Sequence, residues 1–182
     1  MNFNLKKPLQ FTSLALLTGL SLNAAAQTCL LADQYPDEWQ NSRYTINTAA
    51  GTVLDTQTNL MWMRCSLGQA LTSASCAGTA NSGYNWQAAL AAPIATNTTG
   101  FAGFNDWRLP NIKELASLAA LNCTVPSINQ TVFPNTPAGN YWSASPYASF
   151  SSVAWQLGFN NGNDFVSYRN SSLRVRLVRT GP

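Results

Sequence analysis

The sequence predicts an α+β fold, with two short helices among short, mainly antiparallel strands and hairpins. Short segments of alternating apolar and polar residues predict the strands, and two segments with helical spacing lie between them. Of the 182 residues, 46% are apolar and only 9% are charged, which permits a core and excludes a disordered chain. We expect one domain over residues 27–182. The tryptophans in apolar segments are expected in its core: Trp62, Trp107, Trp142 and Trp155.

Strand patterning is found both early and late in this domain. Residues 51–55 and 58–63 predict two strands joined by a polar turn. Residues 154–159 alternate as a half-buried strand does, and the Asn- and Gly-rich residues 160–163 predict a hairpin turn after it. Further strands are expected at residues 141–145, 165–169 and 173–177.

Two helices are expected between the early and the late strands. The first spans residues 85–92 and should end at Pro93, because proline lacks the amide hydrogen that a helix interior uses. The second begins at Asn111, whose side chain can cap the helix while Glu114 reaches back in a capping box. The apolar residues of this segment share one face at helical spacing: Ile112, Leu115, Leu118 and Ala119.

Residues 1–26 have the three parts of a secretory signal peptide. Residues 1–7 are positive, residues 14–22 form an apolar run, and residues 24–26 are alanines suited to cleavage before Gln27. The run is shorter than the roughly 20 apolar residues that cross a bilayer, so we expect no membrane span and a secreted, cell-surface or periplasmic protein. Without the two leader lysines, 8 basic residues face 7 acidic ones, and the net charge falls from +3 to about +1. This balance argues against a nucleic-acid partner.

The cysteines follow the leader and are even in number, which in an oxidising compartment predicts two disulfides. Sequence alone allows three pairings. We favour Cys65–Cys76, because the loop between them is short and polar, which leaves Cys29–Cys123 as the second pair. A zinc site would need C-x-x-C spacing or histidines, and the sequence has neither.

The sequence contains no histidine, which excludes a Ser-His-Asp triad and histidine-ligated metals. Its seven acidic residues do not cluster, so neither a glycosidase carboxylate pair nor a calcium site is indicated. Asp106, Arg108 and Glu114 could form an acid–base site, but an Arg108 ion pair and a Glu114 helix cap are the favoured interpretation. We therefore expect a protein that is not an enzyme and that uses no metal or cofactor.

Four ordered motifs resemble one bacterial family. They are residues 51–55 (GTVLD) with 60–65 (LMWMRC), residues 106–115 (DWRLPNIKEL), residues 133–136 (FPNT) with 141–145 (YWSAS), and residues 154–155 (AW) with 175–179 (VRLVR). Over about residues 43–179 the chain resembles the Lcl C-terminal domain family. The resemblance implies a C-type-lectin-like fold and an extracellular or cell-envelope role. The best-known member is an adhesin that binds sulfated polysaccharides and trimerises through a collagen-like stalk; this sequence has no Gly-X-Y stalk, so trimerisation does not carry over.

Residues 145–172 combine aromatic rings with amides and turn residues, a mixture that suits recognition of a glycan or a protein surface. The candidate ligand-binding residues are Tyr147, Phe150, Asn160, Asn161, Asn163, Phe165, Tyr168 and Asn170. An ordinary polar surface with hairpin turns is the alternative. Arg174 and Arg176 are expected to point outward and, with Arg169 and Arg179, to form an anion-binding strip; protection of an edge strand is the alternative.

These observations favour a secreted or surface-exposed binding domain for adhesion or polysaccharide recognition. Its partner would be a polysaccharide or a cell-surface protein. The alternative is a structural or assembly component of the cell envelope or pilus that has protein partners only. A further alternative is a retroelement-diversified ligand-binding protein, because the Asn, Ser, Tyr and Phe mixture of residues 147–172 resembles the variable segment of such lectin-like proteins.

Overall fold

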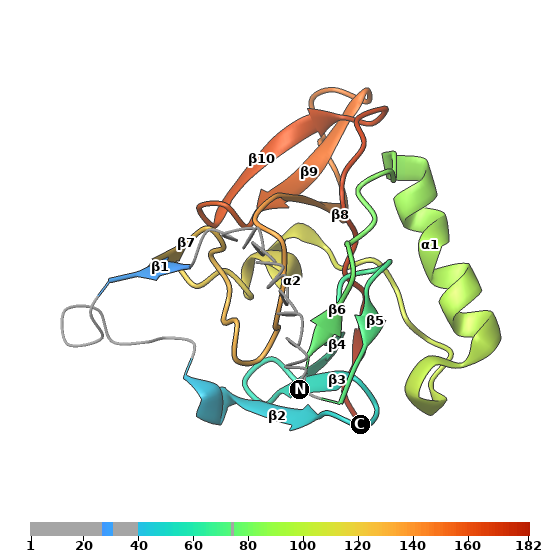
Figure 1. Ribbon diagram of the computed structural model, residues 1–182. Helices are drawn as coiled ribbons and strands as arrows, with labels where there is room; N and C mark the ends of the chain where they lie inside the picture. The colour runs from blue at the N-terminus through green and yellow to red at the C-terminus, as the bar shows by residue number, and fades with distance from the viewer. Residues whose placement is uncertain (1–26, 31–39, 74) are drawn as a thin grey trace, which may run out of the picture.

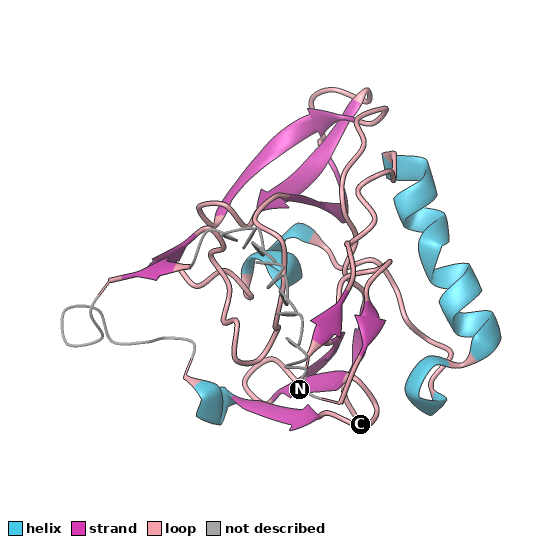
Figure 2. Ribbon diagram, viewed as in Figure 1, coloured by secondary structure: helices cyan, strands magenta, loops and turns pink. Residues whose placement is uncertain are grey.

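The computed structural model describes residues 27–30, 40–73 and 75–182, so the expected signal peptide lies outside the described residues. Small antiparallel sheets surround one short helix, and a longer helix lies along one side of the domain (Figure 1 and Figure 2). The predicted α+β class is therefore confirmed. The helices are α1 (Trp86–Thr99) and α2 (Ile112–Ala116), with 3₁₀ turns η1 (Asn41–Arg43) and η2 (Phe101–Gly103). The strands are β1 (Thr28–Cys29), β2 (Tyr44–Asn47), β3 (Thr52–Asp55), β4 (Leu60–Met63), β5 (Ala70–Leu71), β6 (Cys76–Ala77), β7 (Cys123–Thr124), β8 (Asn140–Pro146), β9 (Val153–Gly158), β10 (Asn163–Tyr168) and β11 (Val178–Thr180).

The largest sheet has the strand order β11-β4-β3-β2, and all of its pairings are antiparallel. The predicted pair of strands before residue 64 is the β3–β4 hairpin, in which Val53 lies opposite Trp62. Both side chains are completely buried. A shift of the pairing by one residue would move Val53 and Trp62 to opposite faces of the hairpin, so their common burial favours this register.

A second sheet has the order β10-β9-β8 and is also antiparallel. β9 and β10 form the predicted hairpin, with pairing from Gly158–Asn163 at the turn to Val153–Tyr168 at the far end. Gly162 closes the turn with a φ of +78°, which a glycine adopts without the strain that a Cβ causes. In the described part of the chain β10 is the edge of this sheet, so the hairpin projects from the domain (Figure 1).

The prediction that the first helix ends at Pro93 is wrong. Pro93 lies inside α1, which continues to Thr99 and ends at Gly100, where φ is +71°. A proline removes one helical hydrogen bond, but the ring of Pro93 is buried together with Ala89 on the face that packs against the domain. Tertiary packing therefore maintains the helix through a residue that usually stops one. At the other end, the Asn85 side chain accepts a hydrogen bond from the Ala88 amide and caps the helix.

The second helix begins as predicted. The Asn111 side chain accepts from the Glu114 amide at 2.9 Å, and the Glu114 carboxylate accepts from the Asn111 amide at 2.8 Å. This capping box is confirmed. The predicted apolar face is also correct, because Leu115, Leu118 and Ala119 are buried in the main core cluster and Ile112 packs against it.

The core consists of two clusters of buried side chains. One surrounds Trp62 and α2, and the other joins Trp107 and Trp142 to α1. These three indoles are at most 2% exposed, as predicted. Trp155 is the exception: it is only half-buried, because its side of β9 faces outward near the open end of the hairpin.

The last predicted strand differs most from expectation. Residues 173–177 run through the interior with hydrogen bonds on both flanks, from the Trp142 amide to the Arg174 carbonyl and from the Leu67 amide to the Val175 carbonyl. With neighbours on both sides, alternate residues have no solvent face to point into. Arg176 is consequently completely buried and Arg174 is half-buried, so the prediction that both point outward is wrong.

Both predicted disulfides are present. Cys65–Cys76 closes a local loop of sequence separation 11, and Cys29–Cys123 joins segments 94 residues apart. The second bond lies within the short β1–β7 ladder and attaches the N-terminal strand to the domain.

Candidate functional site

The carboxylates expected to be structural do form ion pairs. Arg108 Nη1 and Nη2 contact both oxygens of Glu114 at 2.7 and 2.6 Å, which confirms the predicted pair. The hydrogen bonds from Arg108, together with the one from the Asn111 amide, hold the pKa of Glu114 below its usual range although burial opposes this shift. Asp106 instead pairs with Arg179, whose guanidinium lies 3.9 Å from the Phe104 ring centre. The three residues therefore do not converge on one site.

A further ion pair lies in the interior beside the largest sheet. Arg43 Nε donates to Asp55 Oδ1 at 2.8 Å, and Thr58 donates to the other carboxylate oxygen. Burial acts to raise the pKa of Asp55, but these hydrogen bonds hold it below its usual value. The carboxylate is completely buried, so this pair fixes the β2–β3 corner and offers no oxygen to a ligand.

The candidate ligand-binding residues divide between the two ends of the β9–β10 hairpin. Asn160, Asn161 and Asn163 lie at the turn, where the Asn161 side chain accepts from the Asn163 amide at 3.2 Å and the Asn160 carbonyl accepts from Val125. The strands between the ends are six residues long, roughly 20 Å. The amides at the turn are therefore explained by turn geometry and lie far from the other candidates.

An aromatic patch occupies the opposite end of the hairpin, and we define it as Tyr147, Phe150, Trp155, Val166 and Tyr168. Tyr147 stacks on Phe150 with ring centres 6.2 Å apart, and Trp155 meets Tyr147 edge-on at 5.5 Å. Val166 lies opposite Trp155 in the ladder, and Tyr168 lies one pair further along the same face. Phe150 and Tyr168 are 65% and 68% exposed.

Phe165 does not belong to this patch. It lies opposite Gln156 on the other face of the hairpin, and its ring lies over Gly158. Tyr147, Phe150 and Tyr168 of the patch are among the candidates that the sequence predicts, whereas Trp155 is not, because its apolar segment predicts a core position. The position of Trp155 in a strand that precedes an edge strand was the signal that could have indicated its partial exposure.

The predicted anion-binding strip is not present. Arg176 is buried, and its Nη1 donates to the carbonyls of Met63 and Arg64 at 2.8 and 2.6 Å. Its Nη2 donates to the hydroxyl of Thr136 at 2.7 Å, and burial lowers its pKa to about 10. Arg179 is neutralised by its ion pair and Arg174 is half-buried, so these side chains form no common surface. Asn170 and Arg169 instead line a cavity beside α1 together with Trp86.

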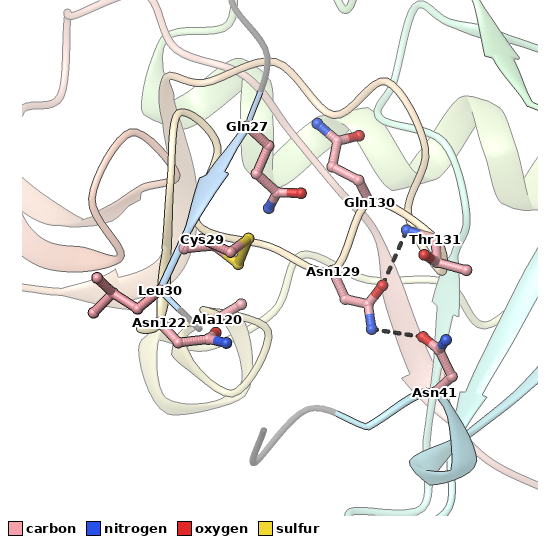
Figure 3. Close-up of a pocket in the computed structure, with 10 residues that line it drawn as sticks. Gln27, Cys29, Leu30, Asn41, Ala120, Asn122, Asn129, Gln130 and Thr131 are labelled. Atoms are coloured by element: carbon pink, nitrogen blue, oxygen red, sulfur yellow. Dashed lines mark hydrogen bonds between the residues drawn. A yellow bond between two sulfur atoms is a disulfide. The ribbon is translucent and has the colours of Figure 1, made fainter. Parts of the chain in front are cut away.

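A second cavity, of about 280 Å³, lies beside the Cys29–Cys123 disulfide, and half of the residues that line it are Asn or Gln (Figure 3). Gln27 donates to the carbonyls of Pro126 and Ile128, both at 2.7 Å. The Asn129 amide nitrogen donates to Asn41 at 2.9 Å, as Figure 3 shows. Much of this polar lining therefore connects neighbouring segments of the chain and has a structural role.

In residues 27–30, 40–73 and 75–182, no group of three or more His, Cys, Asp or Glu side chains is placed to hold a metal ion. Within the same ranges, no helix has the length and apolar character needed to cross a bilayer.

The fold and its surface define a disulfide-linked α+β domain with a partly exposed aromatic patch, formed by the β8–β9 loop and the open end of the β9–β10 hairpin. The family model of the Lcl C-terminal domain matches residues 51–179. The chain belongs to the Lcl C-terminal domain family. Among proteins with curated descriptions, none is significantly similar to it.

Proposed function

We propose that this protein is a secreted or surface-exposed, non-enzymatic binding domain that recognises polysaccharide through the aromatic patch. The observation that carries the proposal is the stacked pair Tyr147–Phe150, in which half-buried Tyr147 meets Trp155 edge-on and Phe150 is 65% exposed. Single exposed apolar side chains are common, but a contiguous group of ordered rings is typical of an interaction surface. Flat aromatic faces provide the apolar surface on which sugar rings stack.

The architecture and the chemistry of the chain support this assignment. We propose a C-type-lectin-like arrangement, which two helices and mainly antiparallel sheets support. Two disulfides agree with an oxidising location, and the signal peptide proposed for residues 1–26 would deliver the chain there. A rigid, covalently linked scaffold reduces the entropy lost when its surface residues bind a ligand.

The test is retention in polysaccharide-containing native gels, together with a glycan array, both with oxidised protein. The combined variant Tyr147→Ala, Phe150→Ala and Tyr168→Ala is expected to lose at least 10-fold in affinity, because each ring contributes stacking area. Ile94→Ala is the matched control, since Ile94 is 67% exposed on α1 and lies outside the patch. Equal retention of the triple variant and the wild type would contradict the proposal. Binding should be the same with calcium and with a chelator.

A second candidate function, an envelope component with protein partners, is favoured by the edge of the hairpin. β10 leaves one edge without a partner strand in the described residues, and Asp164 is its one charged residue. Such an edge can accept a strand from another chain. Phe165→Lys would place a charge at this edge away from the patch. Loss of cross-linking to an envelope protein with unchanged polysaccharide retention would favour this function over the first.

A further inference from the structure

A cavity of about 400 Å³ lies where the beginning of α1 meets the end of β10. It is lined by Asn85, Trp86, Gln87, Leu90, Arg169 and Asn170. In Figure 1 the first turn of α1 lies beside the loops at this end of the β9–β10 hairpin. Arg169 directly follows Tyr168 of the aromatic patch, so the cavity and the patch occupy the same end of the hairpin.

Arg169 is held in a defined orientation in this cavity. Its guanidinium lies 4.2 Å from the centre of the Trp86 ring, and its Nε donates to the Val153 carbonyl at 3.3 Å. Trp86 is itself fixed, because its Nε1 donates to the Ser143 carbonyl and its amide donates to the Arg169 carbonyl. Among the described residues, nothing hydrogen-bonds to the Nη atoms of Arg169. They are preoriented donors at low entropic cost.

The positive charge of Arg169 has no counter-ion in the described part of the chain. The carboxylates of Asp55, Asp106 and Glu114 are each paired with another arginine, and no carboxylate lines the cavity. The first turn of the 14-residue helix α1 adds partial positive charge from its amides. The cavity therefore favours an anionic group.

The remaining lining adds neutral polar and apolar contacts. The side chains of Gln87 and Asn170 form no hydrogen bond with any described residue, so their amide groups can donate and accept. Asn85 uses its oxygen to cap α1, which leaves its NH₂ group as a donor. Leu90 is 41% exposed and forms an apolar wall. One cation, several amides and an apolar wall match a sugar ring that carries an acid group.

We infer that this cavity binds a uronic acid residue of the recognised polysaccharide, with its carboxylate on the Nη atoms of Arg169; the inference rests on the proposed function. The planar guanidinium donates two parallel hydrogen bonds to a planar carboxylate. A single cation in a walled cavity fits one acid group at a time, whereas a run of sulfates would need a row of cations. The amides bind the hydroxyl groups of the sugar ring. The neighbouring sugar residues of the polysaccharide continue to the aromatic patch.

The test compares oligogalacturonate with its methyl ester, in which the carboxylate charge is removed, by titration calorimetry with the oxidised protein. We expect the acid to bind at least 10-fold more tightly than the ester. Arg169→Gln should reduce binding of the acid to the level of the ester. Lys113→Gln is the matched control, because it removes one positive charge from an exposed position of α2 that has no ion pair among the described residues. The Lys113→Gln variant should still bind the acid at least 10-fold more tightly than the ester.

Asn170→Asp is a second variant, on an exposed residue, that does not depend on removal of the stacked guanidinium. It places a negative charge in the cavity and should weaken acid binding several-fold while leaving ester binding unchanged. Equal affinity for acid and ester, or an unchanged preference in both cavity variants, would overturn the inference. Competition by dextran sulfate as strong as that by oligogalacturonate would overturn the assignment to a carboxylate.

Failure of this inference is distinguishable from failure of the proposed function. If neutral polysaccharide binds and the aromatic triple variant abolishes that binding while the acid shows no advantage, the patch stands and the cavity assignment is wrong. If neither the acid, the ester nor a neutral polysaccharide binds, the proposed function itself is wrong and the inference is overturned with it.

Discussion

The guanidinium of Arg176 is buried without a carboxylate among the described residues that contact it, and its charge is balanced by oxygen dipoles and by the Phe133 ring, whose centre lies 4.9 Å away. It donates to the carbonyls of Met63 and Arg64 and to the hydroxyls of Thr136 and Ser66. Burial lowers its pKa to about 10, so the group still carries its charge at neutral pH. The side chain therefore acts as a hydrogen-bond hub that joins the end of β4, the loop before β8 and the C-terminal segment.

We predict that Arg176→Met lowers the free energy of unfolding by about 3–5 kcal/mol, because it leaves several buried acceptors without a donor. Arg176→Lys should lose less, since an ammonium group can still donate to some of them. Urea unfolding at pH 7 measures both changes. A loss below about 1 kcal/mol in the methionine variant would contradict the assigned role.

The sequence pattern around Arg176 was misleading for a physical reason. Alternation of Leu173, Val175 and Leu177 with arginines is typical of a half-exposed strand. The segment instead lies between β8 and residues 63–67, so both of its sides are covered. Whether a strand is central or peripheral depends on residues far away in the chain, and the local pattern contains no information about it.

Among the elements, those specified by adjacent residues were predicted well. The capping box of Asn111 and Glu114, the β3–β4 hairpin and the β9–β10 hairpin each depend on residues close in sequence. Pro93 was predicted wrongly from its neighbours in sequence. The helix α1 continues past it because the helix packs against the domain. Only the tertiary structure determines that balance.

At the scale of α2, we predict that Glu114 makes a pH-dependent contribution to the free energy of unfolding. Its pKa is lowered by hydrogen bonds from Arg108 and from the Asn111 amide, so the charged form stabilises the fold above the unfolded-state pKa. This contribution is lost as the pH falls through the lower folded-state pKa. Glu114→Gln preserves a capping side chain but removes the charge, and should reduce stability by about 1 kcal/mol at pH 7.

Thermal unfolding at pH 7 and near pH 2 measures this difference between Glu114→Gln and the wild type, which should vanish at the lower pH. Asp164→Asn is the control, because Asp164 is exposed and forms no ion pair in the described residues. It should change stability by less than about 0.5 kcal/mol. A deficit of Glu114→Gln that persists at pH 2 would show that lost packing, and not lost charge, is responsible.

At the scale of the whole molecule, the candidate site combines segments that the sequence keeps apart. Tyr147, Phe150 and Tyr168 could be recognised from the composition, because they lie close together in sequence, in the β8–β9 loop and at the end of β10. The cavity beside them could not, since Trp86 begins a helix more than eighty residues before Arg169. Their meeting depends on how α1 packs beside the hairpin, which no local pattern specifies.

The two disulfides close loops of very different length, so their removal is expected to lower the free energy of unfolding by different amounts. In the chain-entropy model, the loop closed by Cys29–Cys123 is worth about 5 kcal/mol and that of Cys65–Cys76 about 3 kcal/mol, because a longer loop restricts the unfolded chain more. The β1–β7 ladder has only two residue pairs, so without its disulfide the N-terminal strand can also detach locally. Because the strand can detach without global unfolding, the measured loss in the free energy of unfolding should not exceed the chain-entropy value of about 5 kcal/mol.

We therefore predict that Cys29→Ser with Cys123→Ser lowers the free energy of unfolding more than Cys65→Ser with Cys76→Ser does, measured by guanidinium unfolding without reductant. Hydrogen exchange should show that the first variant loses protection first at Leu30, whose amide donates to the Asn122 carbonyl beside the ladder. The aromatic patch lies outside both loops, so polysaccharide retention at 25 °C should be unchanged in either folded variant. A larger loss from the short loop would mean that native contacts around Cys65 and Cys76, and not chain entropy, dominate.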